Sequence, residues 1–123
     1  MSKQTILLAE PNELLRKVLT DRLKIEGFRV VVLTNGLELL DAIEKGGDLI
    51  IAEELLPFRN GYEILETAVS RDIPMIVISE ADLEEKILEA FRLGASDFID
   101  KPFSPNEVVA RAKNVLNKMG VKK

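Results

Sequence analysis

Short apolar runs alternate along this chain with longer segments in which apolar residues recur at a helical spacing. The runs are rich in β-branched side chains, which is typical of strands, and they occupy residues 6–9, 30–33, 49–52, 75–78 and 98–99. In the intervening segments, apolar residues recur every four positions among charged ones, which predicts amphipathic helices. The recurring sets are Leu15, Leu19 and Leu23, then Ile87 and Phe91, then Val108, Ala112 and Leu116.

Residues that typically begin and end helices lie at the ends of the predicted helical segments. Asn60 precedes Glu63 by three positions, and residues 104–107, Ser-Pro-Asn-Glu, combine a capping box with proline at the first helical position. Gly46 and Gly94 lie where two of the helices should stop. The capping pattern therefore indicates the same helical segments as the apolar spacing.

The predicted order is five strand–helix pairs, and such alternation requires parallel strands, right-handed crossovers and helices on both faces of the sheet. The runs at 6–9, 49–52 and 75–78 are apolar throughout, as strands buried on both faces are. The runs at 30–33 and 98–99 fit the two edges. The sequence therefore predicts a doubly wound α/β sheet.

Composition and charge limit the functions that we expect of a protein with this fold. The chain has 123 residues, of which 46% are hydrophobic and 31% charged, which is the profile of a compact soluble protein. We therefore expect a single domain over residues 1–123. The formal net charge of −4 provides no basic field for a polyanion, so direct nucleic-acid binding by this segment is not expected.

Several common catalytic groups are missing from the sequence. It contains no cysteine and no histidine, which excludes disulfides, thiolate nucleophiles, cysteine-ligated metals and the commonest general base. The apolar run near the N-terminus, residues 6–9, is far too short for a signal peptide or a membrane span. A cytoplasmic location without membrane attachment is the resulting expectation.

The candidate chemistry lies just after the predicted strands. In an open parallel sheet, ligands bind outside the carboxyl ends of the strands, so the residues that follow each strand are the candidates. They include acids, one hydroxyl and one lysine, and they converge on one edge of the sheet. They are Glu10 and Pro11, Glu53 and Glu54, Ser79 and Glu80, and Asp100 and Lys101.

Together with their surroundings, these residues resemble the receiver domain of two-component response regulators over essentially the full chain. Residues 6–28 are similar to the family's first strand, acidic pair and first helix, and "LPFRNGYEIL" (56–65) is similar to its loop after the third strand. "LGASDFIDKPFSPNEVVAR" (93–111) follows its signature around the fifth strand. The resemblance implies a flavodoxin-like (CheY-like) sheet of five parallel strands, (βα)5, in the strand order 2-1-3-4-5.

The resemblance assigns a role to individual edge residues. Glu53 stands at the position of the aspartate that accepts phosphate, four residues before the loop proline. The family's acidic pair, which helps bind Mg²⁺, falls on Glu10 and Pro11, so one of its two carboxylates is lost. The hydroxyl and the lysine that contact the phosphoryl group match Ser79 and Lys101, although a solvated loop position is the alternative interpretation of the lysine.

Three further positions near the site differ from the family pattern or have a second interpretation. Phe98 matches the family's aromatic switch position without the hydroxyl of the commoner tyrosine, and simple packing is the other interpretation of its ring. Glu80 stands where the family usually has a small residue, and we expect this acid to crowd the site. Glu54 is expected to be a solvent-exposed loop acid, because Glu53 already takes the site position.

These departures predict weak phosphoryl chemistry. Glutamate carries its carboxylate about 1.5 Å further from the backbone than aspartate, and a misplacement of about 1 Å can cost roughly a hundredfold in rate. Mg²⁺ requires near-octahedral geometry, so its binding by Glu10 and Glu53 alone should be weak or absent. We expect the longer arm of Glu53 to project its charge toward Ser79 and Lys101 and to imitate the phosphorylated state.

A possible dimer surface is the last feature that the resemblance implies. Lys86, Asp97 and Arg111 match positions that form salt bridges across a symmetric dimer in the receivers of winged-helix transcription factors. They would lie on the surface of the fourth helix, the fifth strand and the fifth helix. Glu107 lies one helical turn before Arg111, so an intrachain pair is the alternative.

The sequence thus predicts a receiver-like domain of two-component (phosphorelay) signal transduction that is not an enzyme and needs no cofactor. We expect it to act independently of phosphorylation, through contacts with other signalling proteins, an effector domain or a second copy. Two alternatives stay open. One is a working receiver that binds Mg²⁺ through Glu10 and Glu53 and is phosphorylated. The other is a small hydrolase that uses the carboxylate cluster as a base, with few proton-transfer groups available.

Overall fold

The computed structural model describes residues 3–80 and 83–121, and its strands and helices alternate in the predicted order. The strands are β1 (Thr5–Ala9), β2 (Arg29–Leu33), β3 (Leu49–Glu53), β4 (Met75–Ser79) and β5 (Asp97–Asp100). The helices are α1 (Glu13–Ile25), α2 (Gly36–Lys45), α3 (Gly61–Ser70), α4 (Glu84–Arg92) and α5 (Pro105–Val121). Within the described residues, no helix combines the length and the apolar character that crossing a membrane requires.

The five strands are all parallel and form one sheet in the order β2-β1-β3-β4-β5, which confirms the predicted doubly wound fold. β3 and β4 are buried along their whole length and β1 is buried after its first residue, whereas β2 and β5 form the edges as predicted. The strand order reverses between β1 and β3, and such a switch point is where ligands bind in open α/β sheets.

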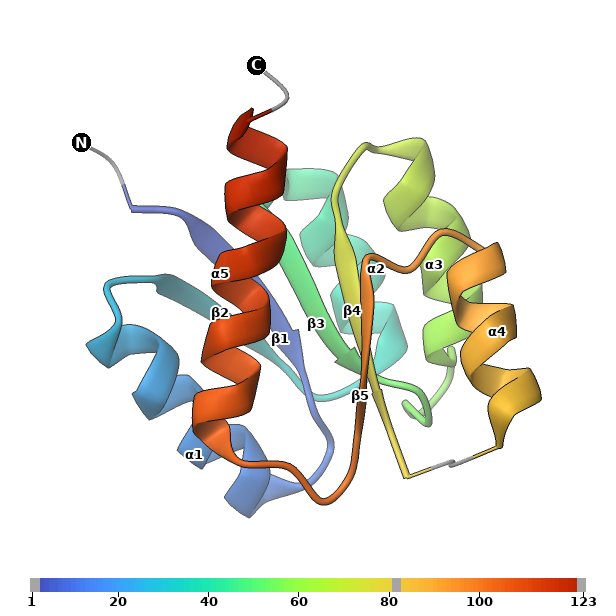
Figure 1. Cartoon of the computed structure of the whole chain (residues 1–123), viewed down its shortest axis with the longest axis horizontal. Helices are drawn as coiled ribbons and strands as arrows, with labels where there is room; N and C mark the ends of the chain where they lie inside the picture. Colours follow the sequence, from blue (N-terminus) through green and yellow to red (C-terminus); the bar gives the residue numbers. More distant parts are fainter. Residues whose placement is uncertain (1–2, 81–82, 122–123) are drawn as a thin grey trace.

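The sheet separates two hydrophobic cores. Helices α1 and α5 pack on one face, and helices α2, α3 and α4 cover the other (Figure 1). Consecutive residues of a strand point to opposite faces, so Ile50 belongs to the α2/α3/α4 core and Ile51 to the α1/α5 core. The same alternation decides on which face each residue that follows a strand will lie.

The predicted helix boundaries are confirmed where caps define them. Asn60 Oδ1 accepts the backbone N–H of Glu63 at 3.0 Å, and the Glu63 side chain accepts the N–H of Asn60 at 3.4 Å, so the capping box is complete. In the box at 104–107, the serine hydroxyl accepts the glutamate N–H at 3.1 Å. Gly46 caps α2 and Gly94 follows α4, with φ angles of 97° and 106° that favour glycine.

Helix α4 buries only part of its apolar side. The spacing of Ile87 and Phe91 predicted an amphipathic helix; Ile87 packs against the core partly buried, whereas Phe91 is 45% exposed. Ala90 is the buried residue of this helix. Because α4 lies beside the edge strand β5, only a narrow strip of it meets the core, and Phe91 and the 60% exposed Leu88 are left on its outer surface.

Candidate functional site

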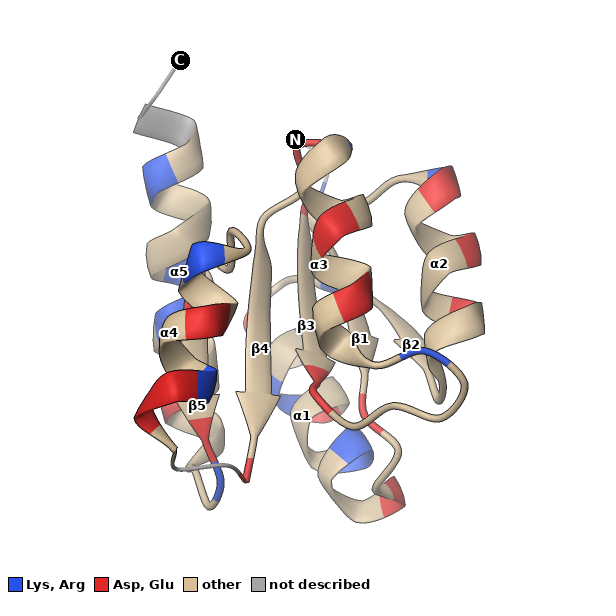
Figure 2. Cartoon of the chain, turned by 90° about the vertical axis from the view of Figure 1, so that its right-hand side faces the viewer, with Lys and Arg blue, Asp and Glu red and all other residues tan. Residues whose placement is uncertain are grey.

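The candidate residues lie at the carboxyl ends of the strands, and the sheet sorts them onto its two faces. Figure 2 shows acidic residues at and beyond the arrowheads of β3 and β4. Glu53 is the register partner of Ile78, whose side chain lies in the α1/α5 core. The next residues along these strands, Glu54 and Ser79, therefore face the α2/α3/α4 side, whereas Glu10 follows β1 on the same side as Glu53.

On the α1/α5 face, the Lys101 ammonium lies between two buried carboxylates. Its Nζ is 2.5 Å from Glu53 Oε1 and 3.1 Å from Glu10 Oε1. The side chains of Lys101, Glu53 and Glu10 are 11%, 8% and 1% exposed, so water barely reaches this ion cluster. A solvated loop position for Lys101, the alternative from the sequence, is wrong.

Ionic interactions and hydrogen bonds offset the desolvation cost of burying the charges in this cluster. Burial lowers the pKa of Lys101, but the hydrogen bond to Glu53 and the charges of Glu10 and Glu53 outweigh it, so the pKa is raised above its ordinary value of 10.5. Glu10 Oε2 accepts the N–H of Asn12 at 3.0 Å, and Oε1 meets the ammonium at ion-pair distance without hydrogen-bond geometry. Arg16 Nη1 donates to the Glu10 carbonyl at 3.0 Å, which adds a second cation nearby.

This arrangement does not fit Mg²⁺. The ion takes six oxygen ligands at about 2.0–2.1 Å in a near-ideal octahedron. In the part of the chain that the structure describes, no group of three or more acidic, histidine or cysteine side chains could hold a metal. Glu10 and Glu53 direct oxygens at an ammonium instead, and Pro11 supplies no side-chain ligand. A divalent cation would have to displace Lys101 from the two carboxylates.

Glu54 forms the centre of a second cluster, on the α2/α3/α4 face. Its side chain is 5% exposed, so the prediction of a solvent-exposed loop acid is wrong. Ser79 Oγ donates to Glu54 Oε1 at 2.5 Å, and Lys86 Nζ lies 3.3 Å from Glu54 Oε2. The Ser79 hydroxyl thus donates to Glu54, whereas the sequence predicted that Glu53 would point toward Ser79. The sheet explains the difference, because Glu54 and Ser79 share a face.

Tyr62 packs beside this second cluster. Its hydroxyl donates to the backbone carbonyl of Lys86 at 3.2 Å and so joins α3 to α4. Desolvation, followed by the negative charges of Glu54 and Glu89, raises the pKa of Tyr62 to about 12. The phenol is therefore neutral, and a hydrogen-bond donor, throughout the physiological pH range.

The remaining site positions lie around these two clusters. Phe98 is buried in the α2/α3/α4 core, where its ring packs against apolar neighbours. Glu80 is exposed and, together with Lys101 and Pro102, lines a shallow hollow at the mouth of the site. Its carboxylate is therefore placed at the entrance rather than inside the ion cluster.

The three residues matched to a dimer surface have partners within the chain. Arg111 Nη1 lies 2.9 Å from Asp97 Oδ1, and Arg111 Nη2 lies 3.1 Å from Glu107 Oε2, which is the intrachain pair that the sequence offered as the alternative. These bonds raise the pKa of Arg111, the bond to Asp97 most strongly. The ammonium of Lys86 reaches Glu54. The monomer therefore satisfies these charges without a second copy.

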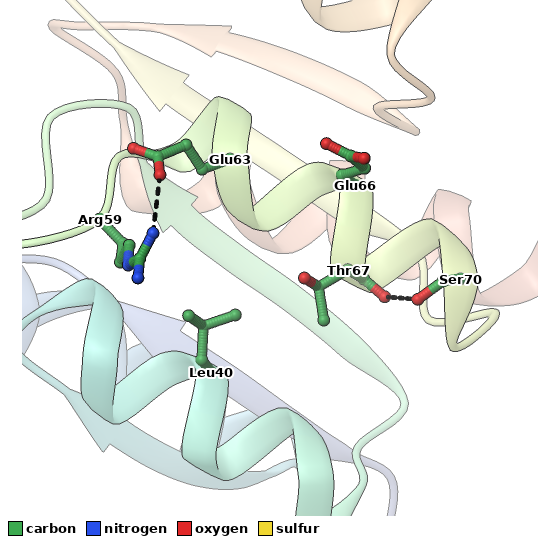
Figure 3. Close-up of a pocket in the computed structure, with 6 residues that line it drawn as sticks. All are labelled: Leu40, Arg59, Glu63, Glu66, Thr67 and Ser70. Carbon is green, nitrogen blue, oxygen red and sulfur yellow. Dashed lines mark hydrogen bonds and ion pairs between the residues drawn. The ribbon is translucent and has the colours of Figure 1, made fainter.

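A separate hollow lies between α2 and α3 (Figure 3). It is lined by Leu40, Arg59, Glu63, Glu66, Thr67 and Ser70. Arg59 pairs with Glu63 at 3.3 Å, and Ser70 Oγ donates to the Thr67 carbonyl at 2.7 Å, so these polar groups bond within the hollow. None of the candidate residues lines it, and we place it outside the site.

The sequence did not predict three contacts around the site: the burial of Glu54 against Ser79 and Lys86, the hydrogen bond from Tyr62 to the Lys86 carbonyl, and the hydrogen bond from Arg16 to the Glu10 carbonyl. Strand alternation carried a signal for the first, because Glu54 follows Glu53 and must face the opposite side of the sheet. No local signal marked the other two. Tyr62 and Lys86 are separated by 24 positions in the sequence, and their contact depends on how α3 and α4 pack.

Known proteins match this chain along most of its length. A family model described as "Response regulator receiver domain" matches residues 6–113. The uncharacterized transcriptional regulatory protein YkoG of Bacillus subtilis is 34% identical over 125 residues, which cover 99% of this chain and 55% of that protein. Response regulator SaeR of Staphylococcus aureus is 34% identical over 96 residues, which cover 76% of this chain and 42% of that protein.

A solved structure supports the same architecture. A response regulator receiver domain protein (CheY-like) from Methanospirillum hungatei superposes with a TM-score of 0.92 at 23% identity, covering 99% of this chain and 100% of that chain. At this identity the likeness shows the fold alone. The chain spans about half the length of the two bacterial relatives that it matches in sequence.

Proposed function

This chain belongs to the response regulator receiver domain family, and we propose that it is a receiver whose signalling state does not depend on phosphorylation. One observation carries the proposal. Lys101, the residue matched to the phosphoryl-contacting lysine, is already bound by Glu53 at 2.5 Å and by Glu10 at 3.1 Å. The contact that a phosphoryl group would make is thus made by the protein's own carboxylates.

The geometry of the ion cluster also opposes phosphoryl transfer. A carboxylate oxygen must approach phosphorus in line with the leaving group, and a metal must neutralise the charge that gathers there. Glu53 Oε1 is held by Lys101, and the donor set around Glu10 does not fit Mg²⁺. A phosphoryl donor would meet buried negative charge that no divalent cation offsets.

Incubation with acetyl phosphate and Mg²⁺ tests this proposal. In a working receiver, a carboxylate oxygen attacks phosphorus, acetate leaves, and the protein gains one phosphoryl group. We expect the intact mass of this protein to stay unchanged in such an incubation, because Glu53 is held by Lys101 and the Mg²⁺ site is incomplete. Mass spectrometry of the intact protein is the measurement.

The matched control variant is Glu53→Ala. If the wild-type protein gained one phosphoryl group and Glu53→Ala gained none, the chain would be a functioning phosphoacceptor and the proposal would be wrong. Unchanged mass in both proteins, with the far-ultraviolet circular dichroism of a folded chain, is the expected result.

The signal passes to other proteins through surface contacts, and the domain itself catalyses no reaction. YkoG is named as a transcriptional regulatory protein, and this chain spans 55% of its length. An effector domain that corresponds to the other part of such relatives is the natural recipient of the signal, alongside other signalling proteins.

A symmetric homodimer through α4, β5 and α5 is the second contact that we propose. Leu88 and Phe91 lie exposed on one side of α4, three residues apart, so they form a short apolar strip. Arg111 and Asp97 lie on the neighbouring elements α5 and β5, and in this dimer their mutual ion pair exchanges with the same pair on the second copy. Apolar side chains flanked by charges are typical of protein interfaces.

Replacing both Leu88 and Phe91 with aspartate should weaken self-association at least tenfold, since removing a hot-spot anchor at the centre of an interface costs about 2 kcal/mol or more. Sedimentation velocity over a concentration series measures the dissociation constant. Leu14→Asp is the control, because Leu14 is also an exposed apolar residue, at 72%, but lies on α1. A wild-type protein that stays monomeric at every concentration, or equal weakening by Leu14→Asp, would exclude this dimer.

A further inference from the structure

Two hydrogen bonds hold the backbone of Glu54, independently of the contacts of its side chain. Its N–H donates to the Ile78 carbonyl at 2.8 Å, which extends the β3–β4 ladder by one residue. Its carbonyl accepts the N–H of Gly61 at 2.7 Å, at the start of α3. The carboxylate therefore projects from a fixed base at the end of the sheet.

From that base, the side chain joins β4 and α4. Ser79 Oγ, at the end of β4, donates to Glu54 Oε1 at 2.5 Å, and Lys86 Nζ, in the first turn of α4, lies 3.3 Å from Oε2. Both carboxylate oxygens are thus used, one by each element. Charge-assisted hydrogen bonds of this kind are stronger than neutral ones, and burial strengthens them further.

Tyr62, on α3, also bonds Lys86 of α4. Its hydroxyl donates to the carbonyl of Lys86, the residue whose ammonium meets Glu54. The backbone and the side chain of a single α4 residue are therefore both held, one by α3 and the other by the end of β3.

Within the described residues, α4 buries little else. Ala90 is its buried residue, Ile87 packs against the core partly buried, and its N-cap residue, Leu83, makes no side-chain capping bond. By contrast, α1, α2 and α3 each begin with an asparagine whose side chain accepts a backbone N–H. With little burial and no side-chain cap from Leu83, α4 depends largely on the bonds that meet at Lys86 for its position on the sheet.

We propose that Glu54 is an internal latch that fixes α4, and with it the exposed strip of Leu88 and Phe91, in one arrangement. The fixed carboxylate bonds the hydroxyl of Ser79, so this end of the sheet is tied to α4 without a phosphoryl group. The inference rests on the proposed function and names the element that keeps a phosphorylation-independent receiver in a single state. Glu53 and Glu54 then have separate tasks, since the first neutralises Lys101 and the second positions α4.

Amide hydrogen exchange of Glu54→Gln, measured by mass spectrometry without any phosphoryl donor, tests the latch. Glutamine keeps the size of the side chain and loses its charge. Bonds to charged groups contribute enough that exchange in α4 should rise roughly tenfold to a hundredfold. Exchange in α1, which packs on the opposite face of the sheet, should stay at the wild-type rate. Lys86→Gln, at a partly exposed position, removes the cation from the same pair and should loosen α4 in the same way.

Glu53→Gln is the matched control, because it makes the same change one residue earlier on the opposite face of the sheet. It should leave α4 exchange at the wild-type rate. The latch is overturned if α4 exchanges equally in the wild type and in both Glu54→Gln and Lys86→Gln, or if Glu53→Gln loosens α4 as much as they do. Phosphoryl uptake by the wild-type protein would overturn the proposed function separately, since the exchange experiment contains no donor.

The single tyrosine provides an independent readout. The chain has one Tyr and no Trp, so tyrosinate absorbance reports Tyr62 alone. Tyr62 is faced by Glu54 from the end of β3 and by Glu89 and Lys86 from α4. In the wild type, Tyr62 should ionise near its pKa of about 12. Glu54→Gln removes a facing negative charge and should lower that pKa, while desolvation keeps it above 10.0. An unchanged midpoint would show that the carboxylate does not face the phenol and would overturn the latch.

Discussion

Lys101→Met is expected to lower the free energy of unfolding by about 3–5 kcal/mol, because it leaves two buried carboxylates without their shared cation. Glu10 and Glu53 are both nearly inaccessible to water, and each meets the ammonium directly. Methionine matches the length of the lysine stem, so the loss measures charge more than packing. Urea-induced unfolding followed by circular dichroism measures the effect.

Two controls separate the ion cluster from a general effect of lost charge. Lys17→Met breaks a pair with Asp21 whose lysine side chain is 75% exposed, and it should change stability by less than about 1 kcal/mol. Adding Glu10→Gln and Glu53→Gln to Lys101→Met removes the unpaired charges and should restore most of the loss. If Lys101→Met alone proved no more harmful than Lys17→Met, the cluster would not be a stabilising feature.

The pH dependence of this difference follows from the raised pKa of Lys101. Burial opposes the shift, and the bond to Glu53 with the charges of Glu10 and Glu53 produces it. A folded-state pKa above the ordinary 10.5 means that the stabilisation is fully present below pH 10.5 and is lost as the pH rises through the folded-state value. The gap between the wild type and Lys101→Met should therefore stay constant from neutral pH up to that region and narrow above it.

The fold could be predicted from the sequence because its signals are local. Each strand is a short apolar run, and Asn60 and the glycines at 46 and 94 mark helix ends by their own chemistry. Phe91 shows where a local signal fails. The helical spacing identified an apolar side of α4, but it could not tell how much of that side an edge strand would cover.

The site could be predicted only in part, because its contacts combine strand alternation with tertiary packing. The residues at the strand ends were identified correctly as neighbours of one edge. Their division into two clusters follows from the period-two alternation, which places Glu53 beside Lys101 and Glu54 beside Ser79. Lys86 lies 32 positions from Glu54 in the sequence, and nothing in the local pattern links them.

If the glutamate at 53 and the proline at 11 are what prevent phosphorylation, changing both should create it. We expect the double variant Pro11→Asp and Glu53→Asp to take up one phosphoryl group from acetyl phosphate in the presence of Mg²⁺, at least about a hundredfold faster than the wild type. The shorter side chain draws the carboxylate back by about 1.5 Å, away from Lys101, and errors of about 1 Å are worth roughly that factor in rate. Aspartate at 11 adds the oxygen ligand that Mg²⁺ lacks.

The control for this gain of phosphoryl uptake is the double variant Pro11→Asp and Glu54→Asp. It shortens the acidic side chain one residue later, on the face of the sheet that carries Ser79 and α4. It should remain unmodified, because the residue at 53 still bonds Lys101. Chelation of Mg²⁺ should abolish uptake by the first variant, since the metal neutralises the charge of the donor. A folded Pro11→Asp and Glu53→Asp protein that gained no mass would show that Lys101 and Glu10 alone keep the site closed, and that the length of the side chain at 53 is not what prevents phosphorylation.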